Sequence, residues 1–158
     1  MGDKQCFRVK GKPFFSIGFQ AHNSMSSTPG LLEYTWNAAR LLEVNTVAVP
    51  VPWETFERTE DSYDRDFVVQ IIDEARKNHL HLVLLWFGTW KNGTMEYTPG
   101  WVKKDWKRFA RAELKDGTKT HNLSPFCQEN LLADQRAFCQ LIRTIREYDQ
   151  QENTVIAV

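Results

Sequence analysis

The chain has 158 residues, which is enough for one domain with a hydrophobic core, and we expect residues 1–158 to form a single domain. Lys plus Arg and Asp plus Glu both number 20, so the chain has no net charge that would attract nucleic acid or an anionic membrane. No apolar stretch approaches the roughly 18 residues of a membrane span. We therefore expect no nucleic-acid partner and no membrane partner.

The three cysteines, Cys6, Cys127 and Cys139, fit no metal-ligand spacing and leave an odd thiol under any pairing. Reduced, buried thiols in a cytoplasmic protein are the favoured interpretation. Residues 1–5 lack the apolar run of a signal peptide, which agrees with that location. No third ligand accompanies His79 and His81, so we predict no metal site, and no other cofactor is expected.

The first elements follow the order strand, then helix. Residues 14–19 form a short apolar run after the turn residues 10–13 and are predicted to be the first strand. A polar loop covers residues 20–28. Pro29 then stands where the first turn of a helix tolerates proline, and apolar residues recur at three- and four-residue steps up to Leu42.

The next two units repeat this order. Residues 45–49 are predicted to be the second strand, ended by Pro50 and Pro52 because proline cannot donate to a sheet. Asp64 is a good N-cap for the second helix. Residues 81–87 are almost continuously apolar, which is typical of a strand covered on both faces in a parallel sheet.

A long insertion follows, from residue 88 to about residue 128, and residues 101–109 within it are predicted to form a short helix. The basic and aromatic residues of 103–111 superficially suggest nucleic-acid binding, but acidic residues interrupt the charge pattern, so a solvated helix face is favoured for Lys103 to Arg111. The third main helix carries one apolar side, consisting of Leu131, Phe138, Leu141, Ile142 and Ile145. Residues 154–158 open a fourth strand.

Alternating strands and helices predict an α/β fold with a parallel sheet and right-handed crossovers. About four strands and three main helices fit half of a (β/α)8 barrel, whose complete form needs about 250 residues, or an open doubly wound sheet. Periodicity alone does not separate these two architectures. Chemistry in both is placed at the carboxyl ends of the strands.

The residues at the three strand ends separate the two architectures. Residues 18–24 (GFQAHNS), 51–57 (VPWETFE) and 86–93 (WFGTWKNG), in this order and spacing, resemble glycoside hydrolase family 35, the β-galactosidase family. The resemblance covers about residues 12–158. It implies that the chain is the N-terminal half of a TIM (β/α)8 barrel and that a carbohydrate, a β-galactoside or related glycoside, is its partner.

The resemblance also implies a retaining mechanism with two glutamates. The acid/base glutamate would follow a few residues after Val158 and the nucleophile much later, so neither would belong to this chain. A retaining glycosidase needs two carboxyl groups about 5–5.5 Å apart. Glu54 and Glu57 are three residues apart in a polar loop, and a solvated, capping role is favoured for Glu57. We therefore expect the chain alone to be inactive.

Five residues are expected to contribute to sugar binding: Gln20, His22, Trp53, Trp90 and Asn92. By resemblance, Asn92 matches an asparagine that hydrogen-bonds the sugar, Trp90 an aromatic residue and His22 a histidine near the pocket. Gln20, Pro50 and Thr94 depart from the family pattern, which leaves the sugar specificity open.

Two other functions remain open. A half-barrel could be a non-catalytic carbohydrate-binding or assembly module, in which its open edges and exposed faces form a homo-oligomer. A different barrel or doubly wound enzyme with phosphate ligands is the weaker alternative, because no glycine-rich phosphate loop follows the first strand.

Overall fold

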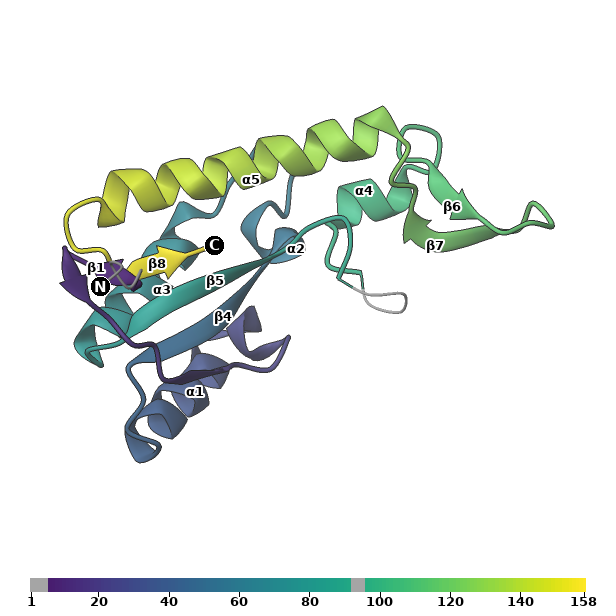
Figure 1. The fold of residues 1–158 in the computed structure, drawn as a ribbon. Helices are drawn as coiled ribbons and strands as arrows, with labels where there is room; N and C mark the ends of the chain where they lie inside the picture. The colour runs from purple at the N-terminus through teal and green to yellow at the C-terminus, as the bar shows by residue number, and fades with distance from the viewer. Residues whose placement is uncertain (1–5, 92–95) are drawn as a thin grey trace, which may run out of the picture.

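The core of the protein is a parallel sheet whose four strands follow one another along the chain. The computed structural model describes residues 6–91 and 96–158. The strands are β3 (Gly18–Gln20), β4 (Thr46–Pro52), β5 (His81–Phe87) and β8 (Val155–Ala157), and they lie in that order (Figure 1). The connecting helices are α1 (Pro29–Leu41), α3 (Arg65–Lys77) and α5 (Gln128–Asp149). This confirms the predicted α/β class with four parallel strands and three main helices.

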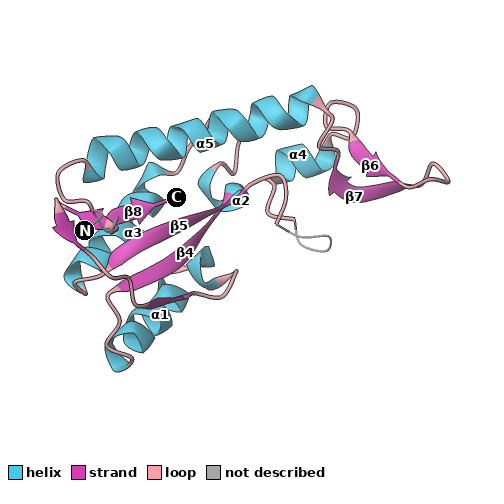
Figure 2. Ribbon diagram, viewed as in Figure 1, coloured by secondary structure: helices cyan, strands magenta, loops and turns pink. Residues whose placement is uncertain are grey.

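Shorter elements flank this sheet, and Figure 2 shows where they join it. A two-residue hairpin, β1 (Arg8–Val9) and β2 (Lys12–Pro13), precedes β3. The short helices are η1 (Met25–Ser27), α2 (Trp53–Phe56) and α4 (Gly100–Lys104). A second hairpin, β6 (Arg111–Glu113) and β7 (Lys119–Leu123), projects beyond the start of α5.

One face of the sheet packs against the three main helices. Alternate residues of β4 and β5 point to this face and are fully buried, among them Val47, Val49 and Leu84. Trp36 of α1, Ile72 of α3 and Leu141 of α5 belong to the same hydrophobic cluster. Burial of one such side chain stabilises the fold by about 1.5–3 kcal/mol, so this layer is the main source of stability.

Strand β4 continues through both prolines, so the prediction that Pro50 ends it was wrong. The backbone N–H of Ala21 donates to the carbonyl of Ala48, which places Ala48 on the β3 side of β4. Pro50 and Pro52 follow at two-residue steps and face the same side, where β3 has already ended. Their missing donors are therefore not needed, and β4 pairs with β5 as far as Phe87.

The first strand is shorter than predicted, because residues 14–17 are not part of it. The side chain of Asn45 occupies the hydrogen-bonding groups of this segment. Its Oδ1 accepts from the N–H of Ile17 at 2.9 Å, and its Nδ2 donates to the carbonyl of Phe15 at 2.9 Å. A side chain thus replaces the neighbouring strand until Gly18.

Both helix starts agree with the sequence. Thr28 accepts a hydrogen bond from the N–H of Leu31 and Pro29 occupies the first turn of α1. Asp64 accepts from the N–H of Phe67 at 3.0 Å and caps α3. Each cap satisfies a backbone donor that the first turn of a helix leaves without a partner.

The predicted apolar side of α5 is only partly buried: Leu141 lies in the core and Ile145 packs against it. Its buried residues are small or polar as well as apolar, namely Asn130, Ala133, Ala137, Leu141, Thr144 and Asp149. Leu131 is 62% exposed and Ile142 is 38% exposed. The prediction assumed that large apolar side chains mark the buried side of the helix, whereas α5 also buries the small side chains of Ala133 and Ala137.

The insertion contains less helix than predicted and a hairpin that was not predicted. Helix α4 ends at Lys104, because the carboxylate of Asp105 accepts from the N–H groups of Lys107 and Arg108 and turns the chain. The solvated helix face is also wrong for Arg111, which is buried and donates to carbonyls of α4.

The cysteines are free, as predicted, but Cys6 and Cys139 are exposed and Cys127 is partly buried, so the expectation of buried thiols was wrong. No helix in the described part of the chain is long and apolar enough to cross a membrane.

Candidate functional site

The carboxyl ends of β3, β4 and β5 lie at one edge of the sheet because the strands are parallel. Gln20 is the last residue of β3, and Trp53 follows directly after β4. Trp90 lies three residues beyond the end of β5. The topology therefore brings these predicted site residues to the same edge.

Trp53 and Glu57 form a buried pair at the end of β4. The indole Nε1 of Trp53 donates to Oε2 of Glu57 at 2.6 Å, and the N–H of Asp61 donates to Oε1 at 2.8 Å. The Trp101 indole donates to the Glu57 carbonyl at 3.2 Å and meets the Trp53 ring edge-on. Trp53 has no exposed surface, so its indole packs in the interior and offers no face to a ligand.

The burial of Glu57 corrects the expectation of a solvated side chain, since Glu57 is only 1% exposed. Burial raises the pKa of its carboxyl above the ordinary value of 4.5, although the hydrogen bonds from Trp53 and Asp61 oppose this effect. Burial, together with the charges of Glu57 and Asp61, raises the pKa of Tyr63 to about 12. The carboxylate of Glu57 thus holds a turn together.

Glu54 contacts residues of the insertion that follows β5. Nζ of Lys103 lies 2.7 Å from Oε2 of Glu54, and the backbone N–H of Glu54 donates to the carbonyl of Tyr97 at 2.8 Å. These contacts join the end of β4 to α4 and to the segment that precedes it. Glu54 and Glu57 therefore have separate partners, and their arrangement is that of structural carboxylates.

Asp134 of α5 fixes the end of β5. Its Oδ1 accepts from Nε1 of Trp86 at 2.7 Å, and its Oδ2 accepts from the N–H of Thr89 at 2.7 Å and from Oγ1 of Thr89 at 2.5 Å. Gly88 allows this approach, because a Cβ there would lie 2.4 Å from Oδ2 of Asp134. Sequence reasoning missed Asp134, since nothing in its spacing connects it with β5.

Trp90 is a partly exposed aromatic side chain near this edge. It is 47% exposed, and its Nε1 donates to the carbonyl of Leu123 in β7 at 2.9 Å. The unpredicted hairpin thus orients the indole while leaving part of it open. Nearby, the ring of Phe87 packs against Tyr97, with their centroids 5.0 Å apart, and Nζ of Lys91 lies 4.6 Å from the Phe87 centroid.

Of the other predicted site residues, Gln20 and His22 belong to the described part of the chain. Gln20 and His22 are exposed at and just after the end of β3. Asn92 and Thr94 lie outside the described residues. The structure thus places Gln20, His22 and Trp90 with exposed side chains at or near the strand ends, whereas Trp53 is interior.

At this edge Gln20 and His22 can hydrogen-bond to a ligand, and the indole of Trp90 can stack against it. Within residues 6–91 and 96–158, no group of three or more His, Cys, Asp and Glu side chains is arranged to hold a metal ion. The carboxylates described above are each occupied by an indole, a backbone N–H, a hydroxyl or an ammonium group.

Comparisons with known proteins identify the architecture. No protein-family model matches the sequence, and no curated protein matches it either. Among solved structures, an exo-β-1,4-mannosidase from Opitutaceae bacterium strain TAV5 is similar over 92% of this chain, with a TM-score of 0.60 and 18% identity. A GH5_18 protein from Bifidobacterium longum subsp. longum is similar over 89% of this chain, with a TM-score of 0.55 and 12% identity.

The chain has the fold of part of a (β/α)8 barrel. This decides between the two architectures that periodicity left open. The chain spans 24% of the length of the mannosidase and 32% of the length of the GH5_18 protein. Identities this low establish the fold and leave the reaction to be argued from the site.

Proposed function

We propose that this chain is a portion of a retaining glycoside hydrolase of the family 35 type, acting on a β-galactoside or a related glycoside. The observation that carries the proposal is the set of strand ends of a glycosidase-like barrel, where exposed Gln20, His22 and Trp90 lie at the edge at which barrel enzymes bind substrate. The resemblance of residues 86–93 to family 35 supports the choice of substrate class.

In this proposal the chain binds sugar and does not cleave it. The partly exposed face of Trp90, held by its bond to Leu123, stacks against the apolar face of a pyranose. Gln20, His22 and Asn92 hydrogen-bond its hydroxyl groups. Trp53 and Glu57 support this edge from below, and Asp134 keeps the end of β5 in place.

The two catalytic glutamates are proposed to lie beyond Val158 in a longer protein. The chain itself uses its two candidate carboxylates structurally, and a retaining mechanism needs one carboxylate to attack and one carboxylic acid to release the leaving group. Residues 1–158 would form one structural domain, which is supported by Tyr63 and Trp86 contacting both of its hydrophobic clusters.

Hydrolysis of nitrophenyl glycosides by this chain and by the parent protein tests the proposal. We expect the parent protein to hydrolyse the β-galactoside, and this chain to hydrolyse none of a set that also includes the β-mannoside and β-glucoside. A parent protein inactive on all three would refute the enzyme proposal. Activity confined to the β-mannoside would keep the glycosidase and exclude the family 35 substrate.

The second candidate is a non-catalytic carbohydrate-binding or assembly module. Exposed apolar side chains favour it, because Phe15 is 80% exposed, Leu41 is 84% exposed and Phe126 is 96% exposed. Sedimentation equilibrium distinguishes the candidates, since an assembly module forms a concentration-independent oligomer in its natural length. A monomeric, sugar-hydrolysing parent protein would exclude it.

A further inference from the structure

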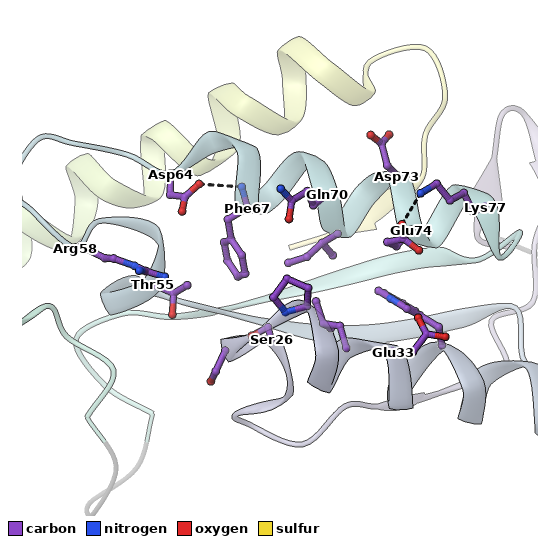
Figure 3. Close-up of a pocket in the computed structure, with 15 residues that line it drawn as sticks. Ser26, Glu33, Thr55, Arg58, Asp64, Phe67, Gln70, Asp73, Glu74 and Lys77 are labelled. Carbon is purple, nitrogen blue, oxygen red and sulfur yellow. Dashed lines mark hydrogen bonds and ion pairs between the residues drawn. The ribbon is translucent and has the colours of Figure 1, made fainter.

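A cavity on the helical side of the sheet lies between α1 and α3, and the segments that follow β3 and β4 line one end of it. Its volume is about 520 Å³, within the range of small-ligand sites. Residues from η1, α1, α2 and α3 are among those that line it, and Figure 3 shows the lining side chains. Its floor is apolar, formed by Leu32, Trp36 and Ile71.

One end of this cavity holds polar side chains without partners. The hydroxyl of Ser26, a residue that is only 1% exposed, makes no hydrogen bond with any residue that the structure describes. No hydrogen bond or ion pair of the side chains of Thr55, Arg58 and Gln70 occurs in the described part of the chain. An unsatisfied buried hydroxyl costs about 1–3 kcal/mol, so Ser26 indicates a missing partner.

Phe67 supplies an apolar surface beside these groups. Its ring lies in the same end of the cavity as Thr55 and Ser26, and its backbone N–H is occupied by the cap from Asp64 (Figure 3). The ring position is therefore set by the helix start. An aromatic face next to several hydrogen-bonding groups matches a ligand that is apolar on one side and rich in hydroxyls at its rim.

The charged side chains of the lining do not favour an anionic ligand. Four acidic side chains line the cavity, those of Glu33, Asp64, Asp73 and Glu74, and three of them are paired: Glu33 with Arg40, Asp73 with Arg76 and Glu74 with Lys77. Nζ of Lys77 lies 2.5 Å from the carboxylate of Glu74, so it offers no free charge. The acidic and basic groups at the cavity balance, so a phosphate or carboxylate would find no excess of positive charge.

We propose that this cavity is a second saccharide-binding site for a neutral sugar, separate from the edge where Trp90 lies. The sugar ring lies on Phe67, and its hydroxyl groups accept from Ser26, Arg58 and Gln70. This site goes beyond the proposed hydrolase function, because it is on the helical side of the sheet and needs no catalytic carboxylate. Its affinity is expected to be on the order of millimolar, as for other ligands of about a dozen heavy atoms.

Titration of the ¹⁵N-labelled chain with methyl β-galactopyranoside, observed by two-dimensional NMR, tests this site. We expect saturable shifts of the backbone amides of Ser26, Phe67 and Gln70. Glucuronate, which carries a negative charge, is expected to bind no more tightly, because the charges at the cavity balance. Shifts confined to residues around Trp90 would support the proposed hydrolase site and overturn this one.

Two variants decide the matter without endangering the fold. Ser26→Ala removes a hydroxyl that has no partner in the protein, and Arg58→Gln changes an exposed side chain, so both are expected to remain folded. Each should weaken binding by about fivefold or more. Ser16→Ala and Arg146→Gln, at exposed positions away from the cavity, are the matched controls and should leave the affinity unchanged. Equal affinities in all four variants would refute the proposal, as would the absence of saturable shifts.

Discussion

The indole Nε1 of Trp53 donates to Oε2 of Glu57 over 2.6 Å, and both side chains are buried where β4 passes into α2. The same carboxylate accepts from the N–H of Asp61 through its other oxygen. One acidic side chain thus satisfies two donors from residues on either side of it in the chain. Its role can be tested separately from any ligand.

Replacing Glu57 with Gln should destabilise the protein by about 1–3 kcal/mol, because the amide nitrogen must face one of the two donors. Urea denaturation followed by tryptophan fluorescence measures the loss. Glu152→Gln is the control, since Glu152 is exposed and pairs only with Lys10. A Glu57→Gln variant as stable as the control would show that the carboxylate is dispensable.

The stability of the protein should depend on pH through Glu57. Burial raises the pKa of this carboxyl in the folded state above 4.5, so the folded protein binds the proton more tightly than the unfolded chain. The contribution is full below pH 4.5 and is lost as the pH rises through the folded pKa. The free energy of unfolding of the natural chain, minus that of Glu57→Gln, should therefore fall from pH 4 to pH 7. A difference that is flat or rises over this range would contradict the assignment.

Asp134→Ala should cost about 2–4 kcal/mol, since it leaves the Trp86 indole and two donors of Thr89 without their charged acceptor. We expect a lower urea midpoint and a shifted emission of Trp86. Gln135→Ala, at the exposed neighbouring position of α5, is the control. An unchanged midpoint in Asp134→Ala would mean that β5 is held by its strand pairing alone.

Two glycine substitutions should have opposite outcomes. A Cβ at Gly88 would lie 2.4 Å from Asp134 Oδ2 and 2.5 Å from Trp86 Nε1, so Gly88→Ala should lose about 1–3 kcal/mol. A Cβ at Gly30 meets nothing within 4 Å, and Gly30→Ala lies in α1, where alanine should gain up to about 1 kcal/mol. Thermal unfolding of the pair measures both. Equal melting temperatures would show that the contact at Gly88 relaxes freely.

Features of the fold that depend on residues close together in the sequence could be predicted. Thr28 and Asp64 cap helices through residues three positions away, so their roles appear in the local pattern. Whether Pro50 and Pro52 interrupt β4 depends instead on where β3 ends, because a proline is tolerated where no neighbouring strand needs its N–H. The local sequence does not specify where β3 ends.

The candidate site was only partly predictable for the same reason. Trp90, as an aromatic residue at a strand end, was named, but the hairpin that orients it was not. Glu57 is buried because α4 brings Trp101 against it from 44 positions away. Asp134 reaches Trp86 across 48 positions. Contacts over such separations are created by the tertiary fold.

The two prolines of β4 limit the backbone pairing that this strand can make on the side of β3. Beyond Ala48, the side of β4 that faces β3 presents carbonyl oxygens at Pro50 and Pro52 but no N–H group. An extended segment at this position would find hydrogen-bond acceptors but no donors on Pro50 and Pro52, so it could not form a regular parallel pair with β4 there. The segment that follows β3 therefore does not continue as a strand paired with β4, and it forms η1, which packs against β4.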